Sequence, residues 1–362
     1  MKLPLLLLLL CSLSGCQAQE FFVGTYTKGE SQGIYKYELQ ANGTIKRKGL
    51  VAQTENPSFL AISADGKFLV AVNEIEKNNT GTAESYRVTE EGLELINRSS
   101  SGGAHPCFVT INNEGYVLTA NYTGGNVGLL KLNGEGELSP LLDVQQHQGK
   151  GITERQQGPH AHSAWFSPSG NQVISVDLGT NQLWFSQLDK TNGELVPSDP
   201  PTLSMKAGAG PRHLAFHPNG NWIYVVNELD CTVALVEQTA QNGYTIHSTT
   251  TTLPEDYQEP NTCADIRVSP DGKFVYASNR GHNSIAMFRV EDDGSLKVLG
   301  HESTQGEWPR NFALSPDGQF LLVANQHTNN IVAFSRDEES GLLKHVGEID
   351  APTPVCILFP SR

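Results

Sequence analysis

The sequence lacks the features of several common classes of protein. Its 362 residues contain no long basic run, and acidic side chains outnumber basic ones by 39 to 25, for a formal net charge of −14. Nucleic acid binding usually needs clustered basic side chains that contact the phosphate backbone, so we expect no nucleic acid partner. Apolar residues at helical spacing are also missing, and no linker-like segment divides the chain. Because so long a chain usually exceeds one hydrophobic core, these absences favour a repeat architecture.

Cysteine is scarce as well, and its spacing fits no zinc-binding pattern. Two of the six cysteines lie near the N-terminus, and the others are Cys107, Cys231, Cys263 and Cys356. We expect Cys231 and Cys263 to lie close enough to form a disulfide in an oxidising compartment. Cys107 and Cys356 are expected to be free, and no metal or other cofactor is expected.

An apolar run stands at the N-terminus, where residues 5–10 are all Leu and lead to the segment "LSGC", which ends at Cys16. The apolar core of about ten residues is shorter than the roughly 20 that a membrane-spanning helix needs. We therefore assign residues 1–16 to an export signal and residues 17–362 to a single folded domain.

The segment "LSGC" resembles the lipobox of bacterial lipoproteins, in which the cysteine becomes the lipidated N-terminus; a plain secretory signal cleaved nearby is the alternative. The resemblance implies lipidation of Cys16 and attachment to a membrane through that lipid alone. In lipoproteins an Asp after the lipidated cysteine favours retention in the inner membrane, and Gln17 stands there in this chain. We therefore expect a monomer in the cell envelope, at the periplasmic face of the outer membrane.

A strand, a tight turn and a second strand recur six times along the chain. One copy, "GPRHLAFHPNGNWIYVVNELD", spans residues 210–230, and another, "TCADIRVSPDGKFVYASNR", ends at Arg280. Each copy alternates in polarity and is rich in Val, Ile, Phe and Tyr on both sides of a turn of the Pro-Asp-Gly or Asn-Gly type. The turn glycines are spaced 46 to 55 residues apart, at Gly66, Gly115, Gly170, Gly220, Gly272 and Gly318.

Two further strands follow each copy. Segments such as "NSIAMFRV" and "NNIVAFSR" predict a third strand, and polar turns such as "EDDGSL" precede a fourth. Four strands per unit of about 50 residues are typical of a β-propeller blade. A seventh blade comes from the ends, because "PTPVCILFP" near the C-terminus matches a first strand and "FFVGTYT" near the N-terminus matches a second. We predict that residues 17–362 form an all-β, seven-bladed β-propeller of four-stranded blades, closed by pairing of N- and C-terminal strands.

One mouth of the central channel is predicted to collect the functional residues. In an antiparallel hairpin the first strand starts where the second ends, and in a propeller every first strand lines the channel. The residue after the Pro position at the first-strand start is Ser58, Cys107, His162, Arg212, Ala264, Arg310 or Val355. The residue that ends the second strand is Glu74, Tyr122, Leu178, Glu228, Arg280 or Gln326. Residues that differ between blades at these positions are the candidates for function.

Residues that repeat between blades are expected to serve the scaffold. An Asn precedes the second-strand end in most blades and is expected to bond backbone there, at Asn73, Asn121, Asn227, Asn279 and Asn325. His217 is expected beside the turn at the opposite face of the ring. His213 is expected to point either into the channel or into a blade, because successive strand residues face opposite ways. Arg212 and Glu228 are expected to face channel water and to contribute little to the core.

Taken together, these segments resemble the seven-bladed propeller lactonase family, which includes bacterial propeller-type 6-phosphogluconolactonases and fungal carboxymuconate lactonising enzymes. The resemblance covers nearly the whole mature chain and is carried by "VGTYT", "NPSFLAISADGKFLVAVNE", "GAHPCFVTINNEGYVLTANYTGGNV", "GPHAHSAWFSPSG", "GAGPRHLAFHPNGNWIYVVNEL" and "SNRGHNSIAMFRV". It implies a site made by a His of "PHAH", the Arg of "GPRH", the Glu of "NE" and the Arg of "NRG", which are here His160 or His162, Arg212, Glu228 and Arg280. It implies no dependence on a metal.

Hydrolysis of a lactone needs a base that activates water, a donor to the developing oxyanion and groups that hold the substituents. We expect a Glu or a His to be the base, one Arg to stabilise the oxyanion and two others to hold a phosphate or carboxylate. The catalytic candidates are Glu228, Arg212, His162 and His160. The candidates for binding a small-molecule lactone are Arg280, Arg310, Glu74 and Asn121. No Ser stands in a Gly-x-Ser-x-Gly setting, which disfavours a serine esterase.

Other functions and substrates stay open. A calcium-dependent propeller of the gluconolactonase kind would use oxygen ligands, to which Glu74, Asn121 and Glu228 could contribute, although the nearby arginines oppose a cation. A non-catalytic propeller could instead bind a sugar acid, a glycan or a protein at the cell envelope, because the fold alone does not decide function. Export would also separate the chain from a cytosolic phosphorylated lactone, which makes a periplasmic aldonolactone an equal alternative.

Overall fold

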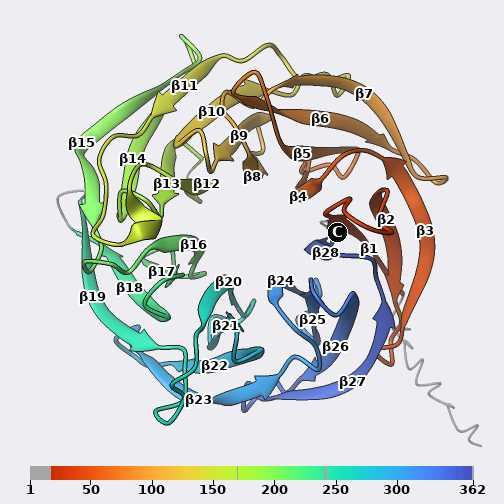
Figure 1. Ribbon diagram of the computed structural model, residues 1–362, viewed down its shortest axis with the longest axis vertical. Coiled ribbons are helices and arrows are strands. Elements are labelled where there is room, and N and C mark those ends of the chain that lie inside the picture. Colours follow the sequence, from red (N-terminus) through yellow and green to blue (C-terminus); the bar gives the residue numbers. More distant parts are fainter. Residues whose placement is uncertain (1–17, 169, 240–242, 361–362) are drawn as a thin grey trace, which may run out of the picture.

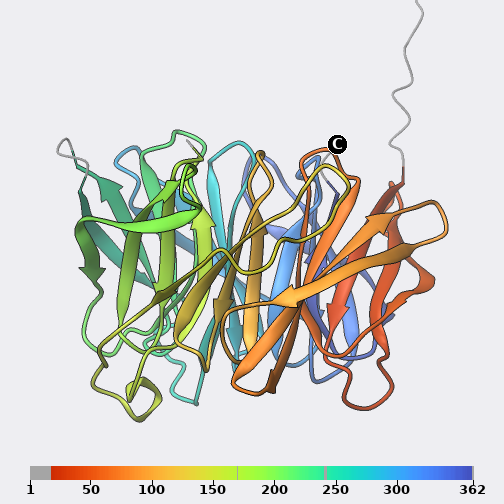
Figure 2. The same cartoon turned by 90° about the horizontal axis from the view of Figure 1, so that it is seen from above.

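Seven four-stranded antiparallel sheets form the blades of a ring in the computed structural model (Figure 1). The structure describes residues 18–168, 170–239 and 243–360. Seen from the side, the blades make a single layer with connecting loops above and below it (Figure 2). The predicted all-β, seven-bladed propeller is confirmed, whereas the predicted export segment with Cys16 lies outside the described residues.

The first strand of each blade lines the channel, and the labels of these inner strands form the innermost circle in Figure 1. The inner strands are β4 (Pro57–Ile62), β8 (Pro106–Ile111), β12 (Ala161–Phe166), β16 (Pro211–Phe216), β20 (Thr262–Val268), β24 (Pro309–Leu314) and β28 (Pro354–Leu358). The second strands are β1 (Gln19–Thr25), β5 (Phe68–Lys77), β9 (Tyr116–Asn121), β13 (Gln172–Asp177), β17 (Trp222–Asn227), β21 (Phe274–Arg280) and β25 (Phe320–Asn325).

The remaining strands continue each blade outward. The third strands are β2 (Gly33–Leu39), β6 (Thr80–Val88), β10 (Asn126–Lys131), β14 (Gln182–Asp189), β18 (Thr232–Gln238), β22 (Ser284–Val290) and β26 (Asn330–Arg336). The outer strands are β3 (Ile45–Gln53), β7 (Leu93–Ser100), β11 (Asp143–Gln146), β15 (Glu194–Ser204), β19 (Tyr244–Thr251), β23 (Leu296–Ser303) and β27 (Leu343–Asp350). A single turn of 3-10 helix, η1 (Glu154–Gln156), precedes β12, and no helix among the described residues has the length and apolar character to cross a membrane.

Burial follows the position of a strand within its blade. Every residue of β9, β21 and β25 is buried, because the second strands are covered on both faces by neighbouring blades. The outer strand β19 alternates half-buried and exposed residues, since one of its faces meets solvent. The apolar core is accordingly divided among the blade interfaces: Phe274 and Tyr276 of β21 pack with Leu321 and Val323 of β25 in the next blade.

The ring closes through the two ends of the chain, as predicted. β28 pairs with β1 in antiparallel register, with Phe22 opposite Leu358 and Gly24 opposite Cys356. β1 then continues to β2 and β3, so one blade combines C-terminal and N-terminal strands. Pairing on both sides of β1 removes the open sheet edge that either end would otherwise leave.

Each inner strand changes register near its start, at the rim of the channel. The pairing with the second strand shifts across Ser58, Cys107, His162, Arg212, Ala264, Arg310 and Val355. Such β-bulges insert a residue that has no direct partner, and they often re-aim side chains beside active sites. The bulged positions coincide with the first-strand positions singled out in the sequence, so the fold turns these side chains toward one mouth.

Candidate functional site

A cavity of about 310 Å³ opens at the bulged end of the channel. Three bulge residues line it, namely Cys107, His162 and Arg310. Most of the remaining wall comes from residues at the ends of second strands, which are Tyr26, Glu74, Tyr122, Glu228 and Arg280. The predicted convergence of unlike side chains from different blades on one mouth is therefore present in the structure.

Glu228 is the centre of a cluster of ion pairs at the base of this cavity. Its Oε2 lies 3.0 Å from Nε of Arg212 and 3.0 Å from Nη2 of Arg280, and its Oε1 accepts a 3.1 Å hydrogen bond from Nη2 of Arg155. Burial favours protonation of the carboxyl, but the three guanidinium groups outweigh burial and lower the pKa of Glu228 to about 2. Glu228 is therefore ionised at any ordinary pH, and both of its oxygens are engaged.

Arg212 lies beneath the cavity, which corrects the expectation that it faces channel water. It is only 2% exposed and is absent from the cavity wall. One nitrogen, Nη1, donates to the backbone oxygen of Ala264 and lies 3.3 Å from Nε2 of His213. Burial, with help from the positive charges of Arg280 and Arg310, lowers the pKa of Arg212 to about 10. Arg212 is thus a buried counter-charge for Glu228 and contributes to the core.

A polar network below Arg212 closes the floor of the site. His213 Nδ1 lies 2.9 Å from Oδ1 of Asp265, whose Oδ2 accepts a 2.6 Å hydrogen bond from Asn311. Burial and the nearby Arg212 lower the pKa of His213 to about 4, so the ring is neutral. His213 therefore points into the channel and not into a blade, because the bulge at Arg212 interrupts the usual alternation.

The two predicted histidines of the "PHAH" segment differ in position. His162 lines the cavity, is 4% exposed and has its Nδ1 3.6 Å from Sγ of Cys107. Burial and the positive charge of Arg212 hold the pKa of His162 well below its usual value, so it is neutral. His160 lies outside the cavity wall, where its ring stacks on Tyr122 at 4.5 Å between centroids. His160 can orient Tyr122 but does not reach the cavity in this arrangement.

A second carboxylate stands on the opposite side of the cavity. Oε2 of Glu74 accepts a 2.8 Å hydrogen bond from the hydroxyl of Tyr26 and lies 4.0 Å from Nη2 of Arg310. The guanidinium of Arg310 lies over the ring of Tyr26 at 5.3 Å, and that of Arg280 lies over Trp308 at 5.2 Å. These contacts between cations and aromatic faces hold the two arginines at the wall.

Asn121 is not a ligand of the cavity, which corrects its place among the predicted substrate-binding residues. Its side chain is fully buried, and Nδ2 donates to the backbone oxygen of Ser101 and to Oδ1 of Asn126. The equivalent Asn279 and Asn325 bond the backbone oxygens of Thr252 and Thr304 in the same way. The recurring Asn therefore ties the strand end to the preceding loop, as its repetition predicted.

Four residues of the cavity wall were missed in the sequence, namely Tyr26, Arg155, Thr262 and Trp308. Tyr26 follows β1 at the position that Glu74 occupies in the next blade, so the repeat pattern could have identified it. Arg155 lies in η1, an insertion outside the repeat, and no spacing rule points to it. Trp308 precedes Pro309 and has a φ of +65°, a strained conformation for a bulky residue. Its backbone is held by a 3.0 Å bond from its N–H to Oδ1 of Asn283.

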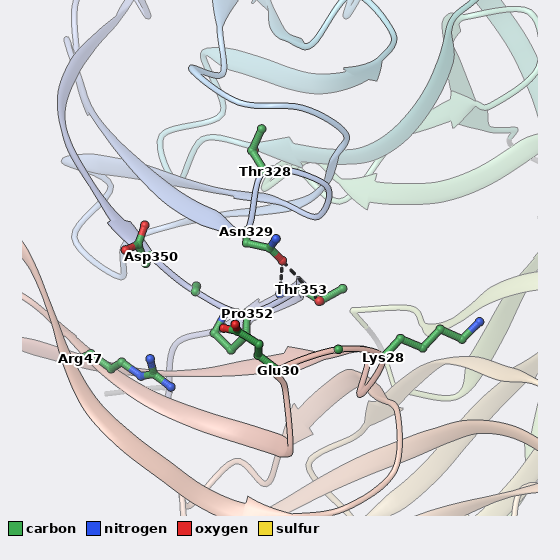
Figure 3. A pocket seen from close by; sticks show the side chains of 10 residues that line it. Lys28, Glu30, Arg47, Thr328, Asn329, Asp350, Pro352 and Thr353 are labelled. Atoms are coloured by element: carbon green, nitrogen blue, oxygen red, sulfur yellow. Dashed lines mark hydrogen bonds between the residues drawn. The ribbon is translucent and has the colours of Figure 1, made fainter.

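A larger cavity of about 440 Å³ lies apart from these residues, where the first and last blades in the chain meet. Figure 3 shows Arg47 and Lys28 well apart on either side of Glu30, with Asp350 on the side of Arg47. All four charged side chains are exposed. The charges balance and are solvated, so this cavity lacks the buried, unbalanced charge that distinguishes the channel mouth.

The structure places Cys231 and Cys263 side by side, as predicted, with both thiols free. The two side chains are in hydrogen-bonding contact, and that contact lowers the pKa of Cys231 to about 7. Cys107 and Cys356 are free, as predicted, and both are buried. The expected proximity of the first pair is thus correct, although no bond joins them.

The positions of the described residues also indicate whether this mouth could bind calcium. No group of three or more His, Cys, Asp and Glu side chains within them is placed to hold a metal ion. Of the three oxygen donors considered, Asn121 bonds the scaffold and Glu228 is surrounded by guanidinium groups. The donor set at this mouth therefore suits an anion and not a divalent cation.

Comparison with known proteins identifies the family whose members this chain resembles. The model of the family described as lactonase, 7-bladed β-propeller, matches residues 20–359. The chain is 36% identical to a 6-phosphogluconolactonase of Bacillus subtilis over 345 residues, or 93% of this chain and 97% of the relative. It is 35% identical to a 6-phosphogluconolactonase of Formosa agariphila, over 89% of this chain and 94% of that protein. The solved structure of a periplasmic gluconolactonase of Pseudomonas aeruginosa is similar at a TM-score of 0.90 and 30% identity, covering 95% of this chain and 99% of that one.

The ion pairs of Glu228 predict a pH dependence of stability. Because the fold lowers the pKa of this carboxyl from its usual 4.5 to about 2, its contribution is complete above pH 4.5 and is lost as the pH falls toward 2. We expect the free energy of unfolding of the wild type to exceed that of Glu228→Gln most above pH 5, with the difference shrinking at lower pH. Urea unfolding of both proteins across this pH range measures the difference in unfolding free energy. A difference that does not change with pH would contradict a stabilising role of the ionised Glu228.

Arg212 is expected to matter for stability as well as for the site. Its removal in Arg212→Ala leaves the buried Glu228 with fewer counter-charges, a change that typically costs about 3 kcal/mol or more. The exposed Arg47 provides the matched control, and Arg47→Ala is expected to change stability by less than about 1 kcal/mol. Equal unfolding free energies for the two variants would show that Arg212 is solvated as first expected.

Proposed function

Because the chain belongs to the seven-bladed β-propeller lactonase family, we propose that it hydrolyses lactones in the cavity at the mouth of its channel. Lactone hydrolysis is a carboxylic ester cleavage in which water attacks the carbonyl carbon and the ring oxygen leaves. The cavity volume of about 310 Å³ suits a ligand of about monosaccharide size. The wall contains arginine side chains that can stabilise an oxyanion and carboxylates that can hold a water molecule, as lactone hydrolysis requires.

The excess of positive charge at the mouth is the observation that supports an anionic substrate. The cavity wall carries three guanidinium groups, those of Arg155, Arg280 and Arg310, and two carboxylates, those of Glu74 and Glu228. Positive charge is therefore in excess at this mouth, in a chain whose formal net charge is −14. Burial of unbalanced positive charge is costly unless an anion completes it. The proposed substrate is therefore a sugar-acid lactone that carries a phosphate or carboxylate.

The roles of the arginines follow from their exposure. Arg310 lies at the wall beside Glu74, where it can donate to an oxyanion that forms next to a water held by that carboxylate. Arg155 is half exposed at the entrance, and with Arg280 it can bind the anionic substituent by paired hydrogen bonds. In this proposal Arg310 replaces the buried Arg212 as the oxyanion donor, and Arg212 fixes Glu228.

A comparison of glucono-1,5-lactone with and without a 6-phosphate tests the proposed substrate class. We expect kcat/KM of the wild type to be at least about tenfold higher with the phosphate, since one charge-assisted bidentate contact contributes on the order of 1.5–3 kcal/mol. Arg155→Ala is expected to remove most of this preference, mainly through KM, whereas the exposed Arg47→Ala keeps it. Assays are corrected for spontaneous hydrolysis and repeated with EDTA, which should not change the rates.

Two outcomes would contradict parts of this proposal. Equal kcat/KM values for both lactones would argue against an anionic substituent while leaving lactone hydrolysis intact. No turnover of any sugar lactone by the folded wild type would favour the non-catalytic alternative, in which the propeller binds a sugar acid, a glycan or a protein. Loss of activity with EDTA would restore the calcium-dependent alternative.

We also propose that the mature protein is anchored in the cell envelope by a lipid on Cys16, as a monomer at the periplasmic face of the outer membrane. The proposal is supported by the apolar leader, by the "LSGC" segment and by Gln17 in place of an Asp. The name of the similar Pseudomonas aeruginosa protein, a periplasmic gluconolactonase, is consistent with that compartment. In this compartment a sugar-acid lactone that carries a carboxylate is as suitable as a phosphorylated one.

Replacement of Cys16 tests the anchor. We expect Cys16→Ser to release the protein from membranes into the soluble fraction without changing kcat or KM, because the lipid supplies the anchor and the propeller forms without it. Ser12→Ala, which leaves the "LSGC" segment intact, is the control. A Cys16→Ser protein that still floats with membranes in a density gradient would contradict the lipid anchor.

A further inference from the structure

We propose that Glu74 is the general base of this site and that Tyr26 positions its carboxylate. The proposal rests on the proposed lactone hydrolysis, and it moves the proton transfer away from Glu228, the carboxylate on which the resemblance to the family had centred. Glu74 and Tyr26 occupy equivalent places in neighbouring blades, because each follows the residue that pairs with the first Pro of the inner strand. Both side chains line the cavity, so the pair stands where a bound lactone would lie.

Glu228 is a poor base because guanidinium groups contact both of its oxygens. Both are engaged by guanidinium groups, with Arg212 and Arg280 at 3.0 Å and Arg155 at 3.1 Å. A proton added to this carboxylate would break charge-assisted contacts in a buried site, where no water replaces them. The pKa of Glu228, lowered to about 2 by these arginines, reflects the same unfavourable protonation. Glu228 is therefore suited to neutralise and orient arginines throughout the reaction.

His162 is disfavoured as the base for a different reason. It lines the cavity, but it would become an imidazolium on accepting a proton, within a cluster that already carries excess positive charge. Burial and Arg212 both oppose that form and hold its pKa well below the usual value. Protonation of the Glu74 carboxylate gives a neutral carboxyl group. It therefore places no new cation in the buried site, as protonation of His162 would.

Glu74 has the open oxygen that a base requires. Only Oε2 is engaged, by the 2.8 Å hydrogen bond from Tyr26 and the more distant Arg310 at 4.0 Å. No group in the described part of the chain bonds Oε1, and the side chain is 17% exposed where Glu228 is 5% exposed. Burial, reinforced by the Glu74 carboxylate, raises the pKa of Tyr26 above its usual range, so the phenol keeps its proton and remains a donor. The bond from Tyr26 thus fixes Oε2 and leaves Oε1 for a water molecule.

The proposed step is balanced with water as the only co-reactant. Oε1 of Glu74 takes a proton from a water molecule as the water oxygen bonds to the lactone carbonyl carbon, and the carbonyl oxygen becomes an oxyanion beside Arg310. Collapse of this intermediate reforms the carbonyl and breaks the bond between that carbon and the ring oxygen. The ring oxygen then receives the proton from the Glu74 carboxyl, which returns the site to its starting state. The product hydroxy acid ionises in solution and releases one proton.

Kinetics of matched variants test the assignment. On the better of the two gluconolactones we expect Glu74→Gln to lower kcat by about a hundredfold or more, the usual scale for loss of a general base, with KM changed less than about threefold. Tyr26→Phe is expected to lower kcat by about tenfold, because the base remains but is less well oriented. Glu55→Gln is the matched control in the same blade, since Glu55 is 57% exposed and lies outside the cavity wall. It should behave as the wild type.

The pH profile separates a base from a structural residue. In the wild type, protonation of the base produces an acid limb in kcat/KM; this limb is expected to vanish in Glu74→Gln and to persist at a reduced rate in Glu74→Asp. Glu228→Gln is expected to lower activity while keeping the acid limb. An active wild type whose Glu74→Gln variant keeps kcat, or keeps the acid limb, would overturn the assignment and leave the lactonase proposal standing. A folded wild type that turns over no lactone would instead overturn the proposed function, and the assignment with it.

Discussion

Three guanidinium groups can share the base of one small cavity only because the carboxylate of Glu228 lies among them. Arg212, Arg280 and Arg155 all contact it, and two of these arginines are almost fully buried. Without that carboxylate, like charges would face each other in a largely buried site, and β16, β21 and η1, which carry them, would be pushed apart. The same cluster leaves positive charge in excess at the cavity, which is the basis for the anionic substrate that we propose.

The propeller makes this cluster possible by separating scaffold from function within each blade. The buried second strands and the recurring Asn at their ends hold the rim at a fixed geometry. A bulge in every inner strand then supplies one side chain that takes no part in the ladder, and this residue can differ between blades without cost to the sheet. A Cys, a His and two arginines at these positions meet residues from the neighbouring second strands, and seven similar hairpins thus form one asymmetric site.

Much of this arrangement could be predicted from the sequence, because it depends on periodicity. The turn glycines and strand alternation gave the blades, and the alignment of copies identified Glu228, Arg280, Arg310 and His162 at one mouth. The features that could not be predicted depend on side-chain contacts that the repeat pattern does not determine. The burial of Arg212 beneath the cavity follows from a bulge that re-aims two successive side chains. Asn121 bonds the scaffold, as its repetition between blades indicates. Arg155 belongs to an insertion, where neighbouring copies offer no comparison.

The central claim is that the mouth of the channel binds an anionic sugar acid between its arginines and Glu74. The most direct test is a crystal structure of the protein with the product analogue 6-phosphogluconate bound. The account predicts the phosphate against Arg155 and Arg280, with the carboxylate next to Arg310 and within hydrogen-bonding reach of a water held by Glu74. Occupation of the cavity between the first and last blades in place of the channel mouth, or a phosphate directed away from the arginines, would contradict it.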